Sequence, residues 1–168
     1  MTQGIAIIPA DESHIAAVWT IFQQVIAAGD AYVFELGTTL EQFTAYWFDP
    51  EHHPHVVLLD GEVVGSYVVK ANQPGRGSHV ANASYMTASA ARGRGIAGMM
   101  CEHSLRYAKS LGFRAMQFNI VVATNPVAVR LWQKHGFRII GTSPGAFRHE
   151  QLGYVDAHVM FRELDDIG

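Results

Sequence analysis

The chain of 168 residues is long enough for one domain with a single buried core, so we expect one domain over residues 1–168. Its 49% hydrophobic and 16% charged residues are typical of a globular protein, and a net charge of −3 argues against a nucleic-acid-binding protein. A single cysteine, Cys101, excludes an intrachain disulfide, and the lack of a signal sequence or of a long apolar run predicts a cytoplasmic protein with no membrane partner.

Hydrophobic periodicity predicts five elements in the first half of the chain. They are strands at residues 4–10, 55–59 and 62–69, and helices from Ile15 to Gly29 and from Thr39 to Pro50. Asp60-Gly61 separates the second and third strands and is a dipeptide that favours a hairpin turn. The segment between the two helices, residues 28–38, is an aromatic-rich loop.

In the second half of the chain, the same patterns predict four strands and two helices. They are strands at residues 79–87, 114–123, 137–142 and 154–163, a helix that ends near Leu111, and a helix from Asn125 to Gly136. Residues 141–154 are predicted to form a loop. The order β-α-α-β-β-β-α-β-α-β-β predicts an α/β fold in which helices cover both faces of a mixed sheet.

Residues 91–98, ARGRGIAG, form a glycine-rich turn between a strand and a helix. A helix N-terminus presents unpaired backbone N–H groups and partial positive charge, and glycines let the backbone approach a ligand closely. Arg92 and Arg94 add positive charge, so the stretch is either a basic turn or a phosphate site. It lacks the Gly-Lys-Ser/Thr of a P-loop and the third glycine of a dinucleotide-binding fingerprint.

Two segments together resemble a known superfamily. Residues 92–97, RGRGIA, resemble the Arg/Gln-x-x-Gly-x-Gly/Ala motif of the GNAT acyl-CoA-dependent N-acyltransferases. Residues 125–137, NPVAVRLWQKHGF, resemble the Asn-x-x-Ala-x-x-Leu-Tyr-x-x-x-Gly-Phe motif of the same superfamily. The order of elements is similar over nearly the whole chain, and the resemblance implies a GNAT fold that uses acetyl-CoA and no metal.

The resemblance also implies where acetyl-CoA binds. Members of the superfamily hold the pyrophosphate with the N–H groups of this loop, and the pantetheine arm with backbone at the end of the preceding strand. The matching positions here are Met86, Thr87, Arg92, Gly93, Arg94, Gly95, Ile96, Ala97, Asn125 and Trp132. Asn125 is also a suitable cap for a helix with Pro126 at its first position, and the two roles are compatible.

Trp132 departs from the motif, because many members have a tyrosine there that protonates the leaving thiolate. An indole N–H does not ionise usefully at neutral pH. Trp132 is therefore expected either to pack in the core or to contact the acyl or pantetheine arm. The thiolate would then take its proton from water or from the substrate ammonium.

Asn82 and Asn119 lie in runs that predict mostly buried strands. An unpaired buried amide costs roughly 1–3 kcal/mol, so each asparagine needs a partner, which is either substrate or a structural hydrogen bond. Residues 118–125 and 131–134 resemble the fungal proline-analogue N-acetyltransferases, whose substrate-holding asparagines match these two positions. That resemblance implies that Asn82 and Asn119 orient a small amino acid such as azetidine-2-carboxylate at the reaction centre.

Tyr32, Phe34 and Glu35 lie in the loop that this fold places over the acceptor, and they are candidates for substrate binding. Glu35 could bind an amine, and a solvated loop carboxylate is the alternative. His79 is a candidate base by its chemistry, with a structural role or a water route as alternatives. Cys101 has no evident paired base, which argues against an acyl-enzyme.

We therefore expect an N-acetyltransferase in which the amine of a small molecule, an amino acid or an analogue, attacks acetyl-CoA directly. The alternatives are acetylation of a peptide N-terminus, a polyamine or an antibiotic, and a non-catalytic acyl-CoA sensor. The resemblance implies a homodimer through the late strands. The three clustered histidines near residue 53 lack metal-ligand spacing, so no metal site is expected.

Overall fold

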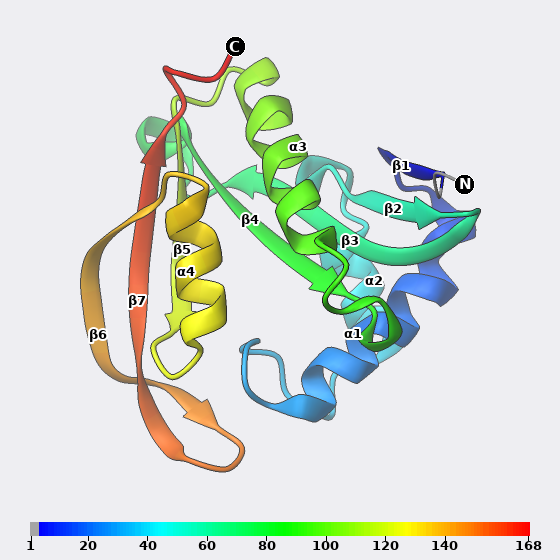
Figure 1. Cartoon of the computed structure of the whole chain (residues 1–168), viewed down its shortest axis with the longest axis horizontal. Coiled ribbons are helices and arrows are strands. Elements are labelled where there is room, and N and C mark those ends of the chain that lie inside the picture. The colour runs from blue at the N-terminus through cyan, green and yellow to red at the C-terminus, as the bar shows by residue number, and fades with distance from the viewer. Residues whose placement is uncertain (1–3) are drawn as a thin grey trace.

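A seven-stranded mixed sheet forms the centre of the computed structural model, which describes residues 4–168 (Figure 1). The strands are β1 (Ile5–Pro9), β2 (His55–Leu59), β3 (Glu62–Ala71), β4 (Val80–Thr87), β5 (Ala115–Val122), β6 (Arg138–His149) and β7 (Gly153–Glu163). Their order in the sheet is β1-β2-β3-β4-β5-β7-β6. Only β4 and β5 are parallel neighbours among these strands.

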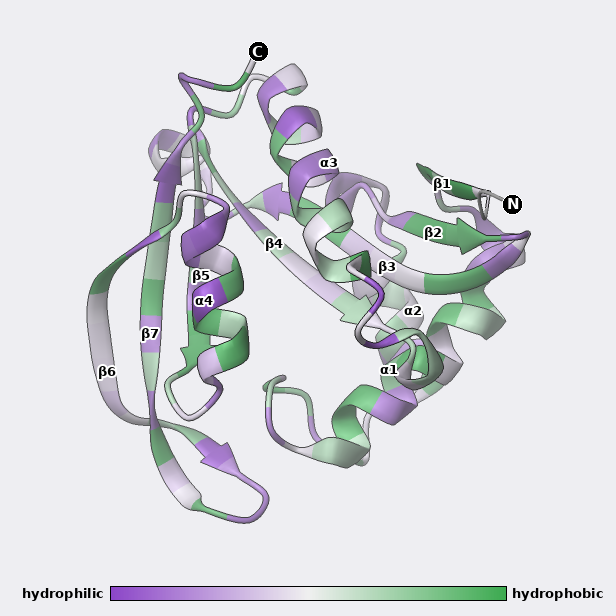
Figure 2. Ribbon diagram, viewed as in Figure 1, coloured by the Kyte–Doolittle hydropathy of each residue, from purple (hydrophilic) through white to green (hydrophobic). Residues whose placement is uncertain are grey.

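Helices cover both faces of the sheet, which confirms the predicted fold class. The α-helices of the described chain are α1 (Ile15–Ala28), α2 (Leu40–Trp47), α3 (Ile96–Ser110) and α4 (Pro126–Lys134). Val56 of β2 packs under α1 and α2, whereas its neighbour Val57 packs under α3, as the alternation of a strand requires. Figure 2 shows hydrophobic and hydrophilic residues alternating along α3 and α4, as expected of helices with one buried side.

Capping residues begin α2 and α4 where the sequence predicted them. Thr39 Oγ1 accepts a hydrogen bond from Gln42 N (3.1 Å), and Gln42 Oε1 accepts one from Thr39 N (2.9 Å). This reciprocal pair is a capping box. Asn125 Oδ1 accepts from Ala128 N (3.2 Å), and Pro126 occupies the first turn.

The strand β6 is longer than the sequence predicted. Residues 141–154 were predicted as a loop, but β6 continues to His149 and turns into β7 at Gly153, whose φ is +75°. The loop prediction is therefore wrong for residues 143–149, which belong to β6. β6 is an edge strand, where a proline needs no ladder partner, and the register shift after Ser143 accommodates the segment.

The tip of the β6–β7 hairpin contacts the loop that follows α1. Glu150 N donates to Gly29 O over 3.0 Å, and Arg148 forms a 2.6 Å ion pair with Glu35. Two segments more than a hundred residues apart therefore meet beside the C-terminal end of β4.

Candidate active site

The strands β4 and β5 form a fork. They pair only through Val80 with Ala115 and Ala81 with Met116, and beyond these residues they diverge. A cavity of about 760 Å³ lies at the divergence. It is lined by residues of β3, β4, β5 and α4, by the loop after α1, and by single residues of α2, α3 and β6, so segments from most of the chain build one site.

Two backbone hydrogen bonds establish which way the backbone groups of β4 point. Asn72 N donates to Val80 O, and Ala88 N donates to Val64 O, each over 2.8 Å. Because hydrogen-bonded pairs alternate along an antiparallel ladder, the even-numbered residues of β4 bond to β3. The odd-numbered residues therefore present their N–H and C=O groups toward β5.

Past the fork, the N–H groups of Tyr85 and Thr87 face the cavity and have no strand partner among residues 4–168. The hydroxyl of Tyr32 donates to the carbonyl of Tyr85. Met86 pairs instead with Ser66 of β3, and its side chain is buried. Met86 and Thr87 were both predicted to bind the pantetheine arm. Thr87 has a free backbone N–H that can do so, whereas Met86 only lines the cavity.

The glycine-rich loop lies between β4 and α3, where its sequence predicted a turn. Gly93 and Gly95 have φ angles of +80° and +77°, in the left-handed region that favours glycine. At the N-cap Gly95, no side chain of the described chain caps α3, which leaves the first N–H groups of the helix free for an anion. Arg92 and Ala97 line the cavity. Arg94 is exposed outside it, and Ile96 is buried in the core.

The residues predicted from α4 also reach the cavity. Asn125 and Trp132 both line it. The Trp132 ring lies 5.1 Å from the ring of Tyr85 and 4.9 Å from the ring of Phe118, measured between centroids. Trp132 is thus half-buried in an aromatic cluster and still presents a surface to the cavity, so both of its predicted roles are geometrically open.

The side chain of Asn82 bridges β4 and β5 at the base of the fork. Its Nδ2 donates to Gln117 O over 2.9 Å, at the position where the backbone ladder between β4 and β5 stops. Within residues 4–168 its Oδ1 receives no hydrogen bond, and the side chain lines the cavity. The amide therefore has one structural bond and one free acceptor.

Asn119 lines the same cavity and is exposed, although most of β5 is buried as predicted. The cause is a register shift between Phe118 and Val121, which takes Asn119 out of the ladder with β7. Its Nδ2 donates to Asn72 Oδ1 (2.8 Å), and its Oδ1 accepts from Gln117 Nε2 (3.0 Å).

The loop after α1 supplies two of its three predicted residues to the cavity. Tyr32 and Phe34 line it, and Phe34 packs against Tyr46 of α2 with 5.3 Å between ring centroids. Burial raises the pKa of Tyr32, so the phenol stays protonated. Glu35 points elsewhere, because its carboxylate pairs with Arg148 at the surface.

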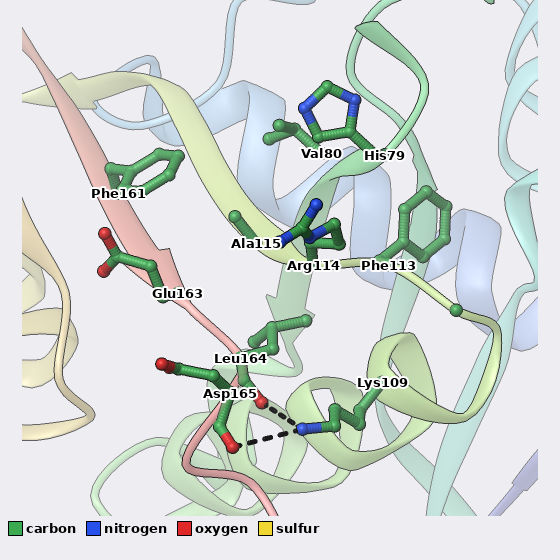
Figure 3. Close-up of a pocket in the computed structure, with 11 residues that line it drawn as sticks. His79, Val80, Lys109, Phe113, Arg114, Ala115, Phe161, Glu163, Leu164 and Asp165 are labelled. Atoms are coloured by element: carbon green, nitrogen blue, oxygen red, sulfur yellow. Dashed lines mark hydrogen bonds between the residues drawn. The ribbon is translucent and has the colours of Figure 1, made fainter.

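His79 lies at the opposite end of β4 from this cavity. It lines a second cavity of about 570 Å³ together with Arg114 and Glu163 (Figure 3). In the same cavity Lys109 Nζ donates to Leu164 O over 2.7 Å. His79 therefore cannot act as the base at the fork, and that interpretation is wrong.

Cys101 is fully buried, and burial raises the pKa of its thiol to about 12. A thiol with this pKa is not a nucleophile at neutral pH, which agrees with the argument against an acyl-enzyme. Within residues 4–168 no group of three or more His, Cys, Asp or Glu side chains is arranged to hold a metal ion. None of the helices in that part of the chain is long and apolar enough to span a membrane.

Among the cavity residues that sequence reasoning missed, four have polar side chains that reach it from β3, α2 and β6 or the turn after β3: Lys70, Asn72, Tyr46 and His149. One of them left a signal. Lys70 interrupts the otherwise apolar end of β3, and its even number places it on the same face as Val68. The other three reach the cavity through packing and strand register, which no local pattern encodes.

Comparison with known proteins gives the same result as the geometry. A model of the acetyltransferase (GNAT) family matches residues 18–137. The N-acetyltransferase aca1 of Schizosaccharomyces pombe is 36% identical over 110 residues, which cover 62% of this chain and 52% of that protein. The L-amino acid N-acetyltransferase AaaT of Escherichia coli is 32% identical over 115 residues, which cover 64% of this chain and 65% of that protein. The matches thus span between half and two thirds of these relatives.

A solved structure is similar over almost its whole length. The GCN5-related N-acetyltransferase from Kribbella flavida superposes with a TM-score of 0.91 and is 42% identical, over 95% of this chain and 97% of that one. The fork between two parallel strands, the glycine-rich loop ahead of α3 and the family match together identify the chain as a member of the acetyltransferase (GNAT) family.

Proposed function

We propose that the protein transfers the acetyl group of acetyl-CoA to the amine of a small molecule, an amino acid or an amino-acid analogue. One observation carries the proposal. The cavity at the fork has the unpaired N–H groups of α3 near one end. At its other end lies the Asn82 amide, whose Oδ1 can still accept a hydrogen bond. The similarity to a protein named for L-amino acid acetylation supports this acceptor class.

The donor end of the cavity suits a CoA thioester. The unpaired N–H groups of α3 and the guanidinium of Arg92 would hold the pyrophosphate. Bound acetyl-CoA supplies the reactive thioester. The N–H groups of Tyr85 and Thr87 face the cavity, where they would hold the pantetheine arm and stabilise negative charge developing on the thioester oxygen.

The acceptor end suits a neutral amine. Asn82 Oδ1 would accept one N–H of the amine and direct the nitrogen lone pair at the acetyl carbon. Each amide atom of Asn119 is bonded once, which leaves one N–H and one lone pair for the rest of the acceptor. The new C–N bond forms as the C–S bond breaks, and the proton lost by the amine passes through water to the thiolate.

The aromatic side chains Tyr32, Tyr85 and Trp132 contribute little to that proton transfer. Burial raises the pKa of both Tyr32 and Tyr85, so neither phenol releases its proton readily. Tyr85 is further held by a 2.7 Å hydrogen bond between its hydroxyl and Ser104 Oγ. The indole of Trp132 does not ionise. Water in the open cavity or the substrate ammonium would then supply the proton to the thiolate.

The direct test is release of thiol from acetyl-CoA in the presence of each of a panel of amines: amino acids, azetidine-2-carboxylate, a polyamine and a peptide. We expect release with at least one amino acid and little with the polyamine. Release with the peptide or polyamine alone would overturn the acceptor class, and acetyl-CoA binding without any release would indicate a sensor. The cytoplasmic location and the homodimer stay predictions.

A further inference from the structure

A lysine lies at the acceptor end of the cavity. Lys70 is half-buried near the end of β3, lines the cavity, and pairs across the ladder with Asn82. Cross-strand partners present their side chains on the same face of a sheet, and their Cα atoms lie about 5.5 Å apart in a hydrogen-bonded pair. The side chains of Lys70 and Asn82 therefore leave the sheet on the same face, and both line the cavity.

The ammonium of Lys70 has no carboxylate partner among residues 4–168. Its Nζ lies 4.8 Å from the centroid of the Tyr46 ring, a cation–π contact that uses the charge but not the three N–H donors. Glu35, the acid predicted for this region, is paired with Arg148 instead. A half-buried cation with free donors beside an open cavity favours an anionic ligand.

The position of the charge also discriminates between acceptors. Arg92 serves the opposite, phosphate-binding end of the cavity, so Lys70 is not needed there. A polyamine would bring a second positive charge toward Lys70 and be repelled. An α-amino acid carries an amine and a carboxylate, and on this face of the sheet Asn82 can accept an N–H while Lys70 can donate to an anion.

We propose that Lys70 is the specificity-determining residue that binds the acceptor carboxylate, and that the acceptors are amino or imino acids with a free α-carboxylate. Asn82 Oδ1 then receives the amine, and Lys70 sets its direction by anchoring the other end of the molecule. This inference rests on the proposed function, because it assigns the acceptor of the same reaction.

The test compares each amino acid that the wild type acetylates, azetidine-2-carboxylate included, with its methyl ester, which keeps the amine and removes the charge. Lys70→Met should lower kcat/KM for the acid about 100-fold, chiefly through KM, because one charged hydrogen bond is lost. The same substitution should change kcat/KM for the ester less than about threefold. Lys70→Arg should recover most of the acid activity, since it restores the charge.

Lys134→Met removes the same charge from an exposed position in the last turn of α4, outside the cavity, and serves as the matched control. Thermal unfolding of each variant reports whether the fold is intact. If Lys70 only packed on Tyr46, Lys70→Met would lower the unfolding temperature or reduce acid and ester activity alike. An equal loss of acid and ester activity in Lys70→Met would overturn the role of Lys70. A wild-type protein that acetylates acid and ester equally well would overturn it too. Neither result would contradict the proposed function.

Calorimetric titration with the same acids in the presence of CoA tests the carboxylate site separately from the proposed activity. Binding that depends on Lys70 without any turnover would retain the carboxylate site and overturn the proposed activity. The absence of both binding and turnover would overturn both.

Discussion

The two ends of the cavity are built in different ways. The donor end comes from short contiguous segments, residues 91–98 and the first turns of α4, whose backbone geometry is local. The acceptor end is assembled from single side chains far apart in the chain, among them Lys70, Asn82 and Asn119. Donor binding should therefore depend on backbone conformation, and acceptor binding on individual side chains.

Gly95→Val should produce the largest effect. Valine is disfavoured at a φ of +77°, so the substitution should reshape the loop that presents the free N–H groups of α3. We expect the KM for acetyl-CoA to rise by on the order of 100-fold, corresponding to a few kcal/mol of lost anion binding. Steady-state kinetics and direct titration with CoA measure it.

Gly37→Ala is the matched control, because Gly37 has no positive φ and nothing lies within 4 Å of an added Cβ. Its KM for acetyl-CoA should be unchanged. Unaltered CoA binding in Gly95→Val would show that the loop is only a basic turn.

Asn82→Ala should separate the two ends of the cavity. The variant loses the free Oδ1 and the 2.9 Å bond to Gln117 O, so kcat/KM for the acceptor should fall roughly 30- to 100-fold. The Kd for CoA, measured by titration, should change less than about threefold. Asn119→Ala should cost less than Asn82→Ala, because its amide is exposed. A matched loss of acceptor and CoA affinity would mean that Asn82 acts through the fork as a whole.

The contrast between the ends also explains what the sequence could predict. The element order, the caps at Thr39 and Asn125, and the glycine-rich turn ahead of α3 follow from residues close together in the chain, so local patterns were sufficient. The GNAT resemblance rested on the same contiguous segments. For this reason the fold and the donor loop were predicted from the sequence.

The acceptor end depends on pairings that a single sequence does not display. The interpretation of His79 as a base was wrong because the site occupies the opposite end of β4. Glu35 does not line the site because its carboxylate pairs at the surface with Arg148 of β6. Asn119 is exposed because of a register shift in β5. Lys70 becomes significant only once its cross-strand partner, Asn82, is known.

The free energy of unfolding should depend moderately on pH, through two histidines that pack beside Tyr67. His55 is buried and stacks on Tyr67, whose hydroxyl lies 2.7 Å from His103 Nδ1. Burial lowers the pKa of both histidines below the ordinary value of 6.5. The neutral forms are favoured in the fold, so stability is complete above about pH 6.5 and falls as the pH drops below it, where the unfolded chain binds protons first.

Urea unfolding between neutral pH and about pH 5 checks this expectation. His79→Gln, at an exposed position, should leave the pH profile unchanged. A free energy of unfolding that stays flat or rises as the pH falls would contradict the buried-histidine explanation.

Glu35→Gln should have the smallest effect. The side chains of Glu35 and Arg148 are 73% and 63% exposed, and such an ion pair contributes about 0.5 kcal/mol or less. Thermal unfolding and acceptor kinetics should both stay close to wild type, with kcat/KM within about twofold. A large rise in acceptor KM would return Glu35 to the acceptor site.

The most direct measurement is mass-spectrometric identification of the product after incubation with acetyl-CoA and a mixture of free amino acids, their methyl esters and a polyamine. We predict N-acetylated amino acids that carry a free carboxylate, formed together with free CoA thiol. An acetylated polyamine or ester in their place, or bound acetyl-CoA with no acetylated product, would contradict an amino-acid acetyltransferase.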